Sequence, residues 1–205
     1  MAVQINIITP DMSRQESDAL SGRTITALSK SSAALEALRI DRLEEATSLH
    51  REALALRLQE YPESSIQVGV TYNGLGEALL RAGRLDEAEE FLHKALVVRE
   101  RDSSAIDAAA TRENVGALRE AQGRFGEARE VRLRGAKKAH ILCSNKHCPK
   151  IGLLSQNQLS TCAACRAPFY CSKDCQIQDW KERHEPLCKA NMSKGKLVKP
   201  ATRYV

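Results

Sequence analysis

All seven cysteines of this 205-residue chain fall between Cys143 and Cys188, and the 142 residues before them contain none. His184 stands at a comparable spacing inside the cluster, which brings the number of soft donor side chains to eight. Tetrahedral zinc takes four such donors, and short gaps within pairs of cysteines are typical of structural zinc sites. The sequence therefore predicts two zinc ions, held by Cys143, Cys148, Cys162, Cys165, Cys171, Cys175, His184 and Cys188.

Other uses of clustered cysteines fit this sequence less well. A disulfide framework would leave one of the seven thiols over, and the N-terminus carries no pattern of a secretory signal. A nucleophilic cysteine would need a thiol outside the metal sites, and the eight ligands use every thiol of the chain. The cluster is therefore interpreted as metal-binding, in a chain that we expect inside the cell, in the nucleus or the cytoplasm.

Helix geometry indicates how the eight ligands divide between two ions. Ser172 is a suitable N-cap and Pro186 a helix stop, so the sequence predicts one helix between them. Cys175 and His184 lie nine positions apart on it, so they point to opposite sides, about 13 Å apart along the axis. Ligands of one zinc lie within about 2.3 Å of the metal, so these two cannot share an ion. The ligands are therefore expected to interleave in a cross-brace, with one set of Cys143, Cys148, Cys171 and Cys175 and another of Cys162, Cys165, His184 and Cys188.

The second half of the cluster carries a more specific pattern. The run YCSKDCQ occupies positions 170–176, and it is followed by Asp179, Trp180, His184 and Cys188. This pattern resembles the second half of a MYND-type zinc finger, and the resemblance covers the 46 residues of the cysteine cluster. The family usually has two residues between its first two cysteines, whereas Cys143 and Cys148 enclose four. His147 lies in this gap and could replace Cys148 as a ligand, and His140 is a more remote substitute.

The MYND resemblance implies that the finger docks short proline-rich peptides. Gln176 and Trp180 match the contact residues of that family. They lie four positions apart, so they share one face of the predicted helix, and a tryptophan ring suits proline. The alternative is that Trp180 only fills the small hydrophobic centre of the finger.

The basic charge of the C-terminal third shrinks once zinc is counted. Residues 136–205 contain 13 Lys or Arg against 4 Asp or Glu, a formal charge of +9. Seven thiolates and two Zn²⁺ ions lower this to about +6. Few aromatic side chains accompany that charge, so a nucleic-acid-binding zinc protein is disfavoured.

The first two thirds of the chain contain an internal repeat. The segments 42–46, 84–88 and 124–128 share an Arg-apolar-x-Glu-Ala pattern (the first reads RLEEA, the second RLDEA and the third RFGEA), and they recur after 42 and then 40 residues. Gly83 and Gly123 stand where a left-handed residue closes the preceding helix. Three helical hairpins are therefore predicted, with Gly76 and Gly116 where the two helices of a hairpin approach closely. The pattern resembles the tetratricopeptide repeat in the longer form found in kinesin light chains. A plain helical bundle is the alternative.

The fold class that follows is an all-α helical-repeat superhelix of about three tetratricopeptide-like hairpins and a small cross-braced module with two zinc ions. The expected domains are a flexible arm at 1–20, the repeats at 21–140, the MYND-type finger at 141–190 and a basic disordered tail at 191–205. Almost no linker separates the last hairpin from Cys143, so the zinc module is expected to pack on that hairpin and cap it.

The tetratricopeptide resemblance also implies a concave groove, lined by the first helix of each hairpin, that holds a peptide or a partner helix. On the register of the family, the groove candidates are Asn73, Glu77, Arg81, Glu113 and Glu120. The alternative for these residues is an ordinary solvated helix face.

These features predict a non-enzymatic adaptor that binds proteins or peptides through both modules, with its oligomeric state left open. A RING-like ubiquitin-ligase module is the main alternative, although His184 is the seventh ligand rather than a central one. A relative of SET–MYND methyltransferases without the catalytic domain is a further alternative. No apolar stretch is long enough to span a membrane, and no catalytic constellation accompanies His50 or His93.

Overall fold

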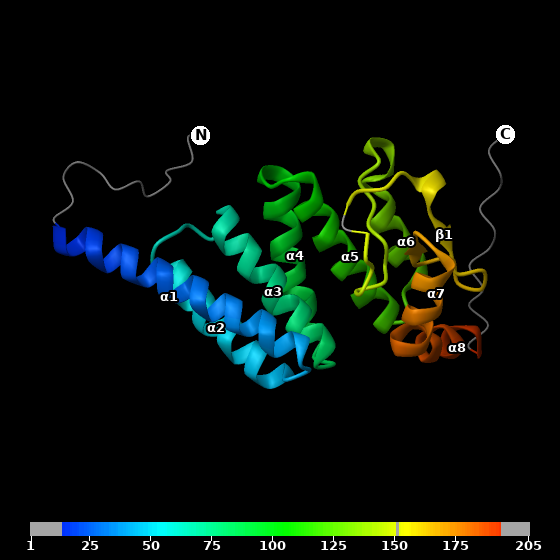
Figure 1. Cartoon of the computed structure of the whole chain (residues 1–205), viewed down its shortest axis with the longest axis horizontal. Helices are drawn as coiled ribbons and strands as arrows, with labels where there is room; N and C mark the ends of the chain where they lie inside the picture. Colours follow the sequence, from blue (N-terminus) through cyan, green and yellow to red (C-terminus); the bar gives the residue numbers. More distant parts are fainter. Residues whose placement is uncertain (1–13, 151, 194–205) are drawn as a thin grey trace. The chain divides into compact units, whose positions relative to one another are not determined.

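The computed structural model describes residues 14–150 and 152–193, and helices make up most of that range. The repeat region contains α1 (Arg14–Arg39), α2 (Leu43–Leu58), α3 (Ile66–Arg81), α4 (Leu85–Asp102), α5 (Ala105–Ala121) and α6 (Phe125–Leu133). The cysteine-rich region contains η1 (Ala136–Lys138), η2 (Gln156–Gln158), β1 (Ser160–Thr161), β2 (Phe169–Tyr170), α7 (Lys173–Asp179), η3 (Trp180–His184) and α8 (Glu185–Ser193). Figure 1 labels most of these elements. The predicted class, helical repeats followed by a cysteine-rich module, is confirmed.

The contacts of the chain define two compact units, which divide after Ser103. The first contains α1 to α4, and the second contains α5, α6 and the cysteine-rich module. The contacts thus group the third hairpin with the module, although the sequence repeat groups that hairpin with the other two.

The first unit consists of two antiparallel hairpins, α1 with α2 and α3 with α4, and α2 also packs on α3. Its buried apolar side chains are alanine, leucine and valine, together with Tyr72 of α3. Gly76 of α3 is buried against Leu92 of α4, where an added Cβ would lie 2.6 Å from Leu92 Cγ. The close approach predicted at Gly76 is therefore confirmed.

Three equivalent turns set the register of the hairpins. Gly83 and Gly123 both have a φ of 75°, and Asp41 at the same place in the first hairpin has a φ of 61°. In each turn, the following arginine donates its backbone N–H to the carbonyl five residues earlier, as Arg84 does to Leu79 at 2.9 Å. The left-handed closures predicted at the two glycines are confirmed. Asp41 was missed because aspartate adopts this conformation less often than glycine.

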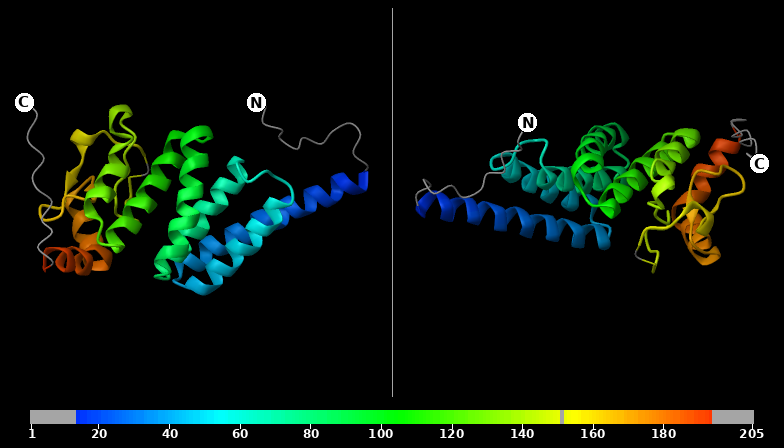
Figure 2. Two further views of the ribbon diagram at one scale, coloured as in Figure 1. Left: turned by 180° about the vertical axis from the view of Figure 1, so that it is seen from behind. Right: turned by 90° about the horizontal axis from the view of Figure 1, so that it is seen from above.

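The second unit joins the α5–α6 hairpin to a module with little regular structure before α7. Strands β1 and β2 pair antiparallel, with Ser160 opposite Tyr170, and Ile141 forms an isolated bridge with Leu154. Phe125 and Ala128 of α6 share one buried cluster with Tyr170 and several cysteines. The predicted packing of the module on the last hairpin is therefore confirmed, and Figure 2 gives two further views of these elements.

The helix predicted to stop before Pro186 instead continues through it. α7, η3 and α8 follow one another without a break, and α8 ends at Ser193. η3 is a π-helical turn, in which the N–H of Glu185 donates to the carbonyl of Trp180. A proline breaks the interior of a regular helix through its missing N–H and its clash with the preceding turn, but Pro186 is the second residue of α8, directly after the π turn, and a first-turn position tolerates proline.

The two predicted chain ends lie largely outside the described residues. The residues outside the described range are 1–13 of the predicted arm and 194–205 of the predicted tail. Within the described part, α1 begins at Arg14 and α8 ends at Ser193, so helix enters both of these predicted segments. In residues 14–150 and 152–193, no helix combines the length and the apolar character needed to cross a bilayer.

Candidate metal centres

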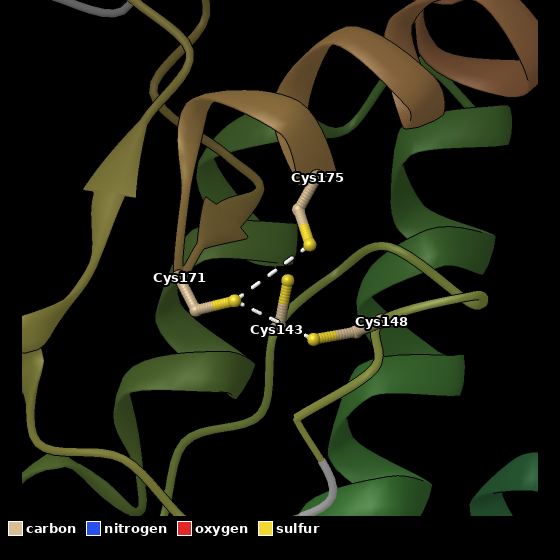
Figure 3. A group of neighbouring side chains, drawn as sticks. All are labelled: Cys143, Cys148, Cys171 and Cys175. Atoms are coloured by element: carbon tan, nitrogen blue, oxygen red, sulfur yellow. Dashed lines mark hydrogen bonds between the residues drawn. The ribbon is translucent and has the colours of Figure 1, made fainter.

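The first group of donors consists of four cysteine thiols from two separate segments. Cys143 and Cys148 come from the loop after the third hairpin, Cys171 lies two residues before α7, and Cys175 lies in the first turn of that helix. Their Sγ atoms all lie within 4.8 Å of one another and point toward a common centre (Figure 3). The Sγ of Cys171 is 3.4 Å from that of Cys148 and 3.7 Å from that of Cys175. The Ser172 side chain caps α7 by accepting the N–H of Cys175 at 3.2 Å, which fixes where that thiol points.

The second group joins two cysteines near β1 to the C-terminal helices. Cys162 and Cys165 follow β1, His184 ends the π turn, and Cys188 lies one turn further along α8. The Sγ atoms of Cys162 and Cys188 lie 3.9 Å apart, and Nε2 of His184 is 3.3 Å from the Sγ of Cys165. All four side chains are buried, so this group is more enclosed than the first.

The donor set fits zinc. A tetrahedral ion with bonds of about 2.3 Å separates two sulfur ligands by about 3.8 Å, close to the sulfur distances of both groups. A disulfide would bring two sulfurs to about 2 Å, and all seven cysteines are free. The contact between the Cys162 and Cys165 thiols lowers the pKa of Cys162 and raises the pKa of Cys165. A bound dication would remove this conflict between the two pKa shifts, because it stabilises both thiols as thiolates. These groups fit two zinc ions per chain.

The structure divides the eight donors as helix geometry predicts. Cys175 and His184 belong to different groups, and each group joins an early and a late segment of the module. The cross-brace is therefore confirmed. In the described residues, Cys148 and not His147 belongs to the first group. His147 is about half exposed, and its Nε2 lies 3.3 Å from Oε2 of Glu182. This geometry favours Cys148 as the ligand.

The groove candidates fall into two sets. Asn73, Glu77 and Arg81 lie on α3 and are partly exposed, and Arg81 donates to Asp41 at 2.9 Å. Glu113 and Glu120 lie on α5 at its contact with the cysteine-rich module. Glu113 binds Arg132 and accepts from Ser144, and Glu120 is 1% exposed. The expectation that these two glutamates line an open groove is corrected, because the module covers the face of α5 on which they lie.

Glu120 joins the hairpin to the second donor group. Its Oε2 lies 3.0 Å from Nδ1 of His184 and 2.9 Å from a nitrogen of Arg183. Arg132, whose side chain is 1% exposed, donates to the other oxygen. Burial raises the pKa of Glu120, but the charges of Arg132 and Arg183 outweigh this and hold that pKa well below its usual value. Glu120 is therefore a buried carboxylate in contact with a metal-ligand histidine, a role that its place in the repeat pattern did not reveal.

Gln176 lies in the middle of α7, Trp180 begins η3 one turn later, and both are partly exposed. The Trp180 ring meets the His184 ring edge-on, with the ring centroids 5.7 Å apart. Trp180 also packs against the buried cluster of the module. One part of this side chain thus supports the second donor group, and another part reaches solvent.

Family comparisons agree with both halves of this architecture. The tetratricopeptide repeat family matches residues 23–101 and 67–131, which together span more than half of the 205 residues. The MYND finger family matches residues 143–188, the span that holds all eight donors. This chain is a tetratricopeptide-repeat protein with a MYND finger. Tetratricopeptide repeats and MYND fingers are typically non-catalytic modules that mediate contacts between proteins, so this protein carries two interaction modules.

One curated protein shares sequence with this tetratricopeptide-repeat MYND protein over a short stretch. It is SET domain-containing protein 14 of Caenorhabditis elegans, which is 40% identical over 53 residues. That stretch is 26% of this chain and 12% of the nematode protein. The chain therefore spans about an eighth of that relative.

Proposed function

We propose that this protein is a non-enzymatic adaptor, in which the MYND finger binds short proline-rich peptides and the repeats bind a second protein. The observation that carries the first half is the position of Trp180. Its ring is braced by His184 and the buried cluster, and it is still partly exposed one turn after Gln176. A rigid, partly exposed tryptophan offers a flat apolar surface to a proline ring and loses little conformational entropy on binding.

The neighbouring surface suits such a ligand. Ile177, between the two proposed contact residues, is 43% exposed, so apolar area continues beside Trp180. Gln176 can donate and accept hydrogen bonds, and a proline-rich backbone presents carbonyl groups that lack partners of their own. The proposed peptide site therefore consists of Gln176, Ile177 and Trp180.

The second half of the proposal concerns α3. Asn73, Glu77 and Arg81 recur at intervals of four residues, so they follow one stripe of that helix. The stripe carries an amide and both signs of charge, which suits a polar peptide or a partner helix better than an apolar one. Since the seven cysteines suit thiolate chemistry in a reducing compartment, the proposal includes an intracellular location.

Peptide binding by the intact chain tests the finger. Labelled proline-rich peptides are titrated with the wild-type protein, with Trp180→Ala and with Lys181→Ala, a control at an exposed neighbouring position. We expect saturable binding that Trp180→Ala weakens at least about tenfold, since aromatic anchors dominate such interfaces. The metal content should stay the same in all three proteins. Equal binding by wild type and Trp180→Ala would reject this site.

A further inference from the structure

The third repeat hairpin contributes a side chain to the surroundings of the second metal centre. Glu120 lies on α5, 64 positions before His184 in the sequence, yet its Oε2 is 3.0 Å from Nδ1 of that histidine. The other ring nitrogen, Nε2, faces the Sγ of Cys165 at 3.3 Å. The imidazole thus has one nitrogen turned toward the donor group and the other turned toward a carboxylate.

This arrangement fixes the tautomer of the ring. A neutral imidazole carries one N–H, and a metal ligand must offer the lone pair of its other nitrogen. A carboxylate at Nδ1 accepts that N–H, which leaves the lone pair of Nε2 for a metal and holds the ring at a fixed angle. We infer that Glu120 is the positioning residue of the second zinc centre, so that the centre is complete only with the third repeat hairpin in place.

The surroundings of Glu120 favour its ionised form and hold it still. Arg183 donates to the same oxygen that faces His184, at 2.9 Å, and is itself held by Asp179 at 2.8 Å. Arg132 donates to the other oxygen and to the carbonyl of Ala167, 3.2 Å away in the module. The carboxylate therefore has a partner on each oxygen, and these contacts leave it little freedom to move away from the imidazole.

Glu113 provides a matched control on the same helix. It binds Arg132 through both carboxylate oxygens, at 2.8 Å and 2.7 Å, and it accepts from Ser144 of the module at 3.1 Å. None of its hydrogen bonds reaches His184. Glu113 thus shares the guanidinium partner and the interface of Glu120, but it lacks the contact that the inference assigns to Glu120.

The experiment measures metal affinity in the full chain by competition with a chelator, and cadmium NMR assigns each release to the Cys₄ or the Cys₃His centre. Glu120→Gln should weaken the Cys₃His centre by about tenfold to a hundredfold, the usual effect of losing such a partner. The Cys₄ centre should be unchanged, and Glu113→Gln should leave both centres unchanged. Unchanged affinity of the Cys₃His centre in Glu120→Gln would overturn the inference.

A second background separates positioning from general loss of structure. His184→Cys replaces the imidazole by a thiolate, which has no N–H for a carboxylate to hold. In that background Glu120→Gln should cost far less metal affinity than in the wild type. An equal cost in both backgrounds would show a purely structural role for Glu120 and overturn the inference.

If Glu120→Gln fails to fold, Glu120→Asp tests the positioning role of Glu120 instead. It keeps the charge beside Arg132 and Arg183 but withdraws the carboxylate from the imidazole by one methylene. A weaker Cys₃His centre in a folded Glu120→Asp protein supports the inference, and wild-type affinity overturns it.

Discussion

Arg132 of α6 lies directly against Gly116 of α5, where an added Cβ would be 2.6 Å from the guanidinium carbon. Leu92 lies against Gly76 in the same way in the preceding hairpin. Each of these two residues stands 40 positions before its counterpart, Arg132 or Gly116. An arginine therefore occupies the place of a core leucine in this repeat. Its charge is satisfied by Glu113, Glu120 and the Ala167 carbonyl. The departure from the repeat pattern thus follows from the contact with the MYND finger.

Replacing this arginine by the leucine of the preceding hairpin tests that explanation. Arg132→Leu should keep the helical packing but leave the buried Glu120 without one of its cationic partners. Breaking a buried ion pair in this way costs about 3–5 kcal/mol. Urea unfolding of the second unit, followed by the single tryptophan of the chain, Trp180, measures the loss.

The matched control for Arg132→Leu is Arg124→Ala, which removes an exposed pair with Glu127. Such pairs contribute at most about 1 kcal/mol. A destabilisation by Arg132→Leu no larger than that of the control would contradict a structural role for the buried arginine.

The close approach of α3 and α4 gives a second prediction. Gly76→Leu should force these helices apart and destabilise the first unit by roughly 1–3 kcal/mol, because the Leu92 side chain already fills the space beside Gly76. Thermal melting followed by circular dichroism measures this destabilisation. Gly22→Ala on α1, where an added Cβ meets nothing within 4 Å, should instead be neutral or stabilise by about 0.5–1 kcal/mol. An unchanged melt for Gly76→Leu would count against this register of the repeat.

Particular residues show what the sequence could predict. The interleaved ligand sets follow from the nine-residue spacing of Cys175 and His184, because helix geometry alone separates them. The hairpin turns follow from Gly83 and Gly123, whose positive φ values glycine tolerates best. The burial of Glu120 could not be predicted, since it depends on Arg183 and His184, more than 60 positions away. The helix through Pro186 was not predicted because proline usually signals a helix stop, and the sequence did not indicate the π turn that precedes this proline.

Two neighbouring substitutions test whether Cys148 or His147 is a ligand of the first metal centre. Cys148→Ser should lower the zinc content by one ion per chain, because its Sγ belongs to the first donor group. His147→Ala should leave the zinc content unchanged, since that side chain lies against Glu182 instead. Elemental analysis of the purified proteins measures both. The reverse pattern would make His147 the ligand.

Loss of the second zinc ion should also destabilise residues outside the MYND finger. Cys165→Ser should cost one zinc ion, and structural zinc contributes on the order of 10 kcal/mol to the folding of such modules. Cys165 shares a buried cluster with Phe125 and Ala128 of α6, so the loss should also loosen the third hairpin. Hydrogen exchange followed by mass spectrometry should show faster exchange in α5, α6 and α8, while α1 to α4 exchange as in the wild type. Unchanged protection of α6 in a protein that has lost this ion would mean that the hairpin folds independently of the finger.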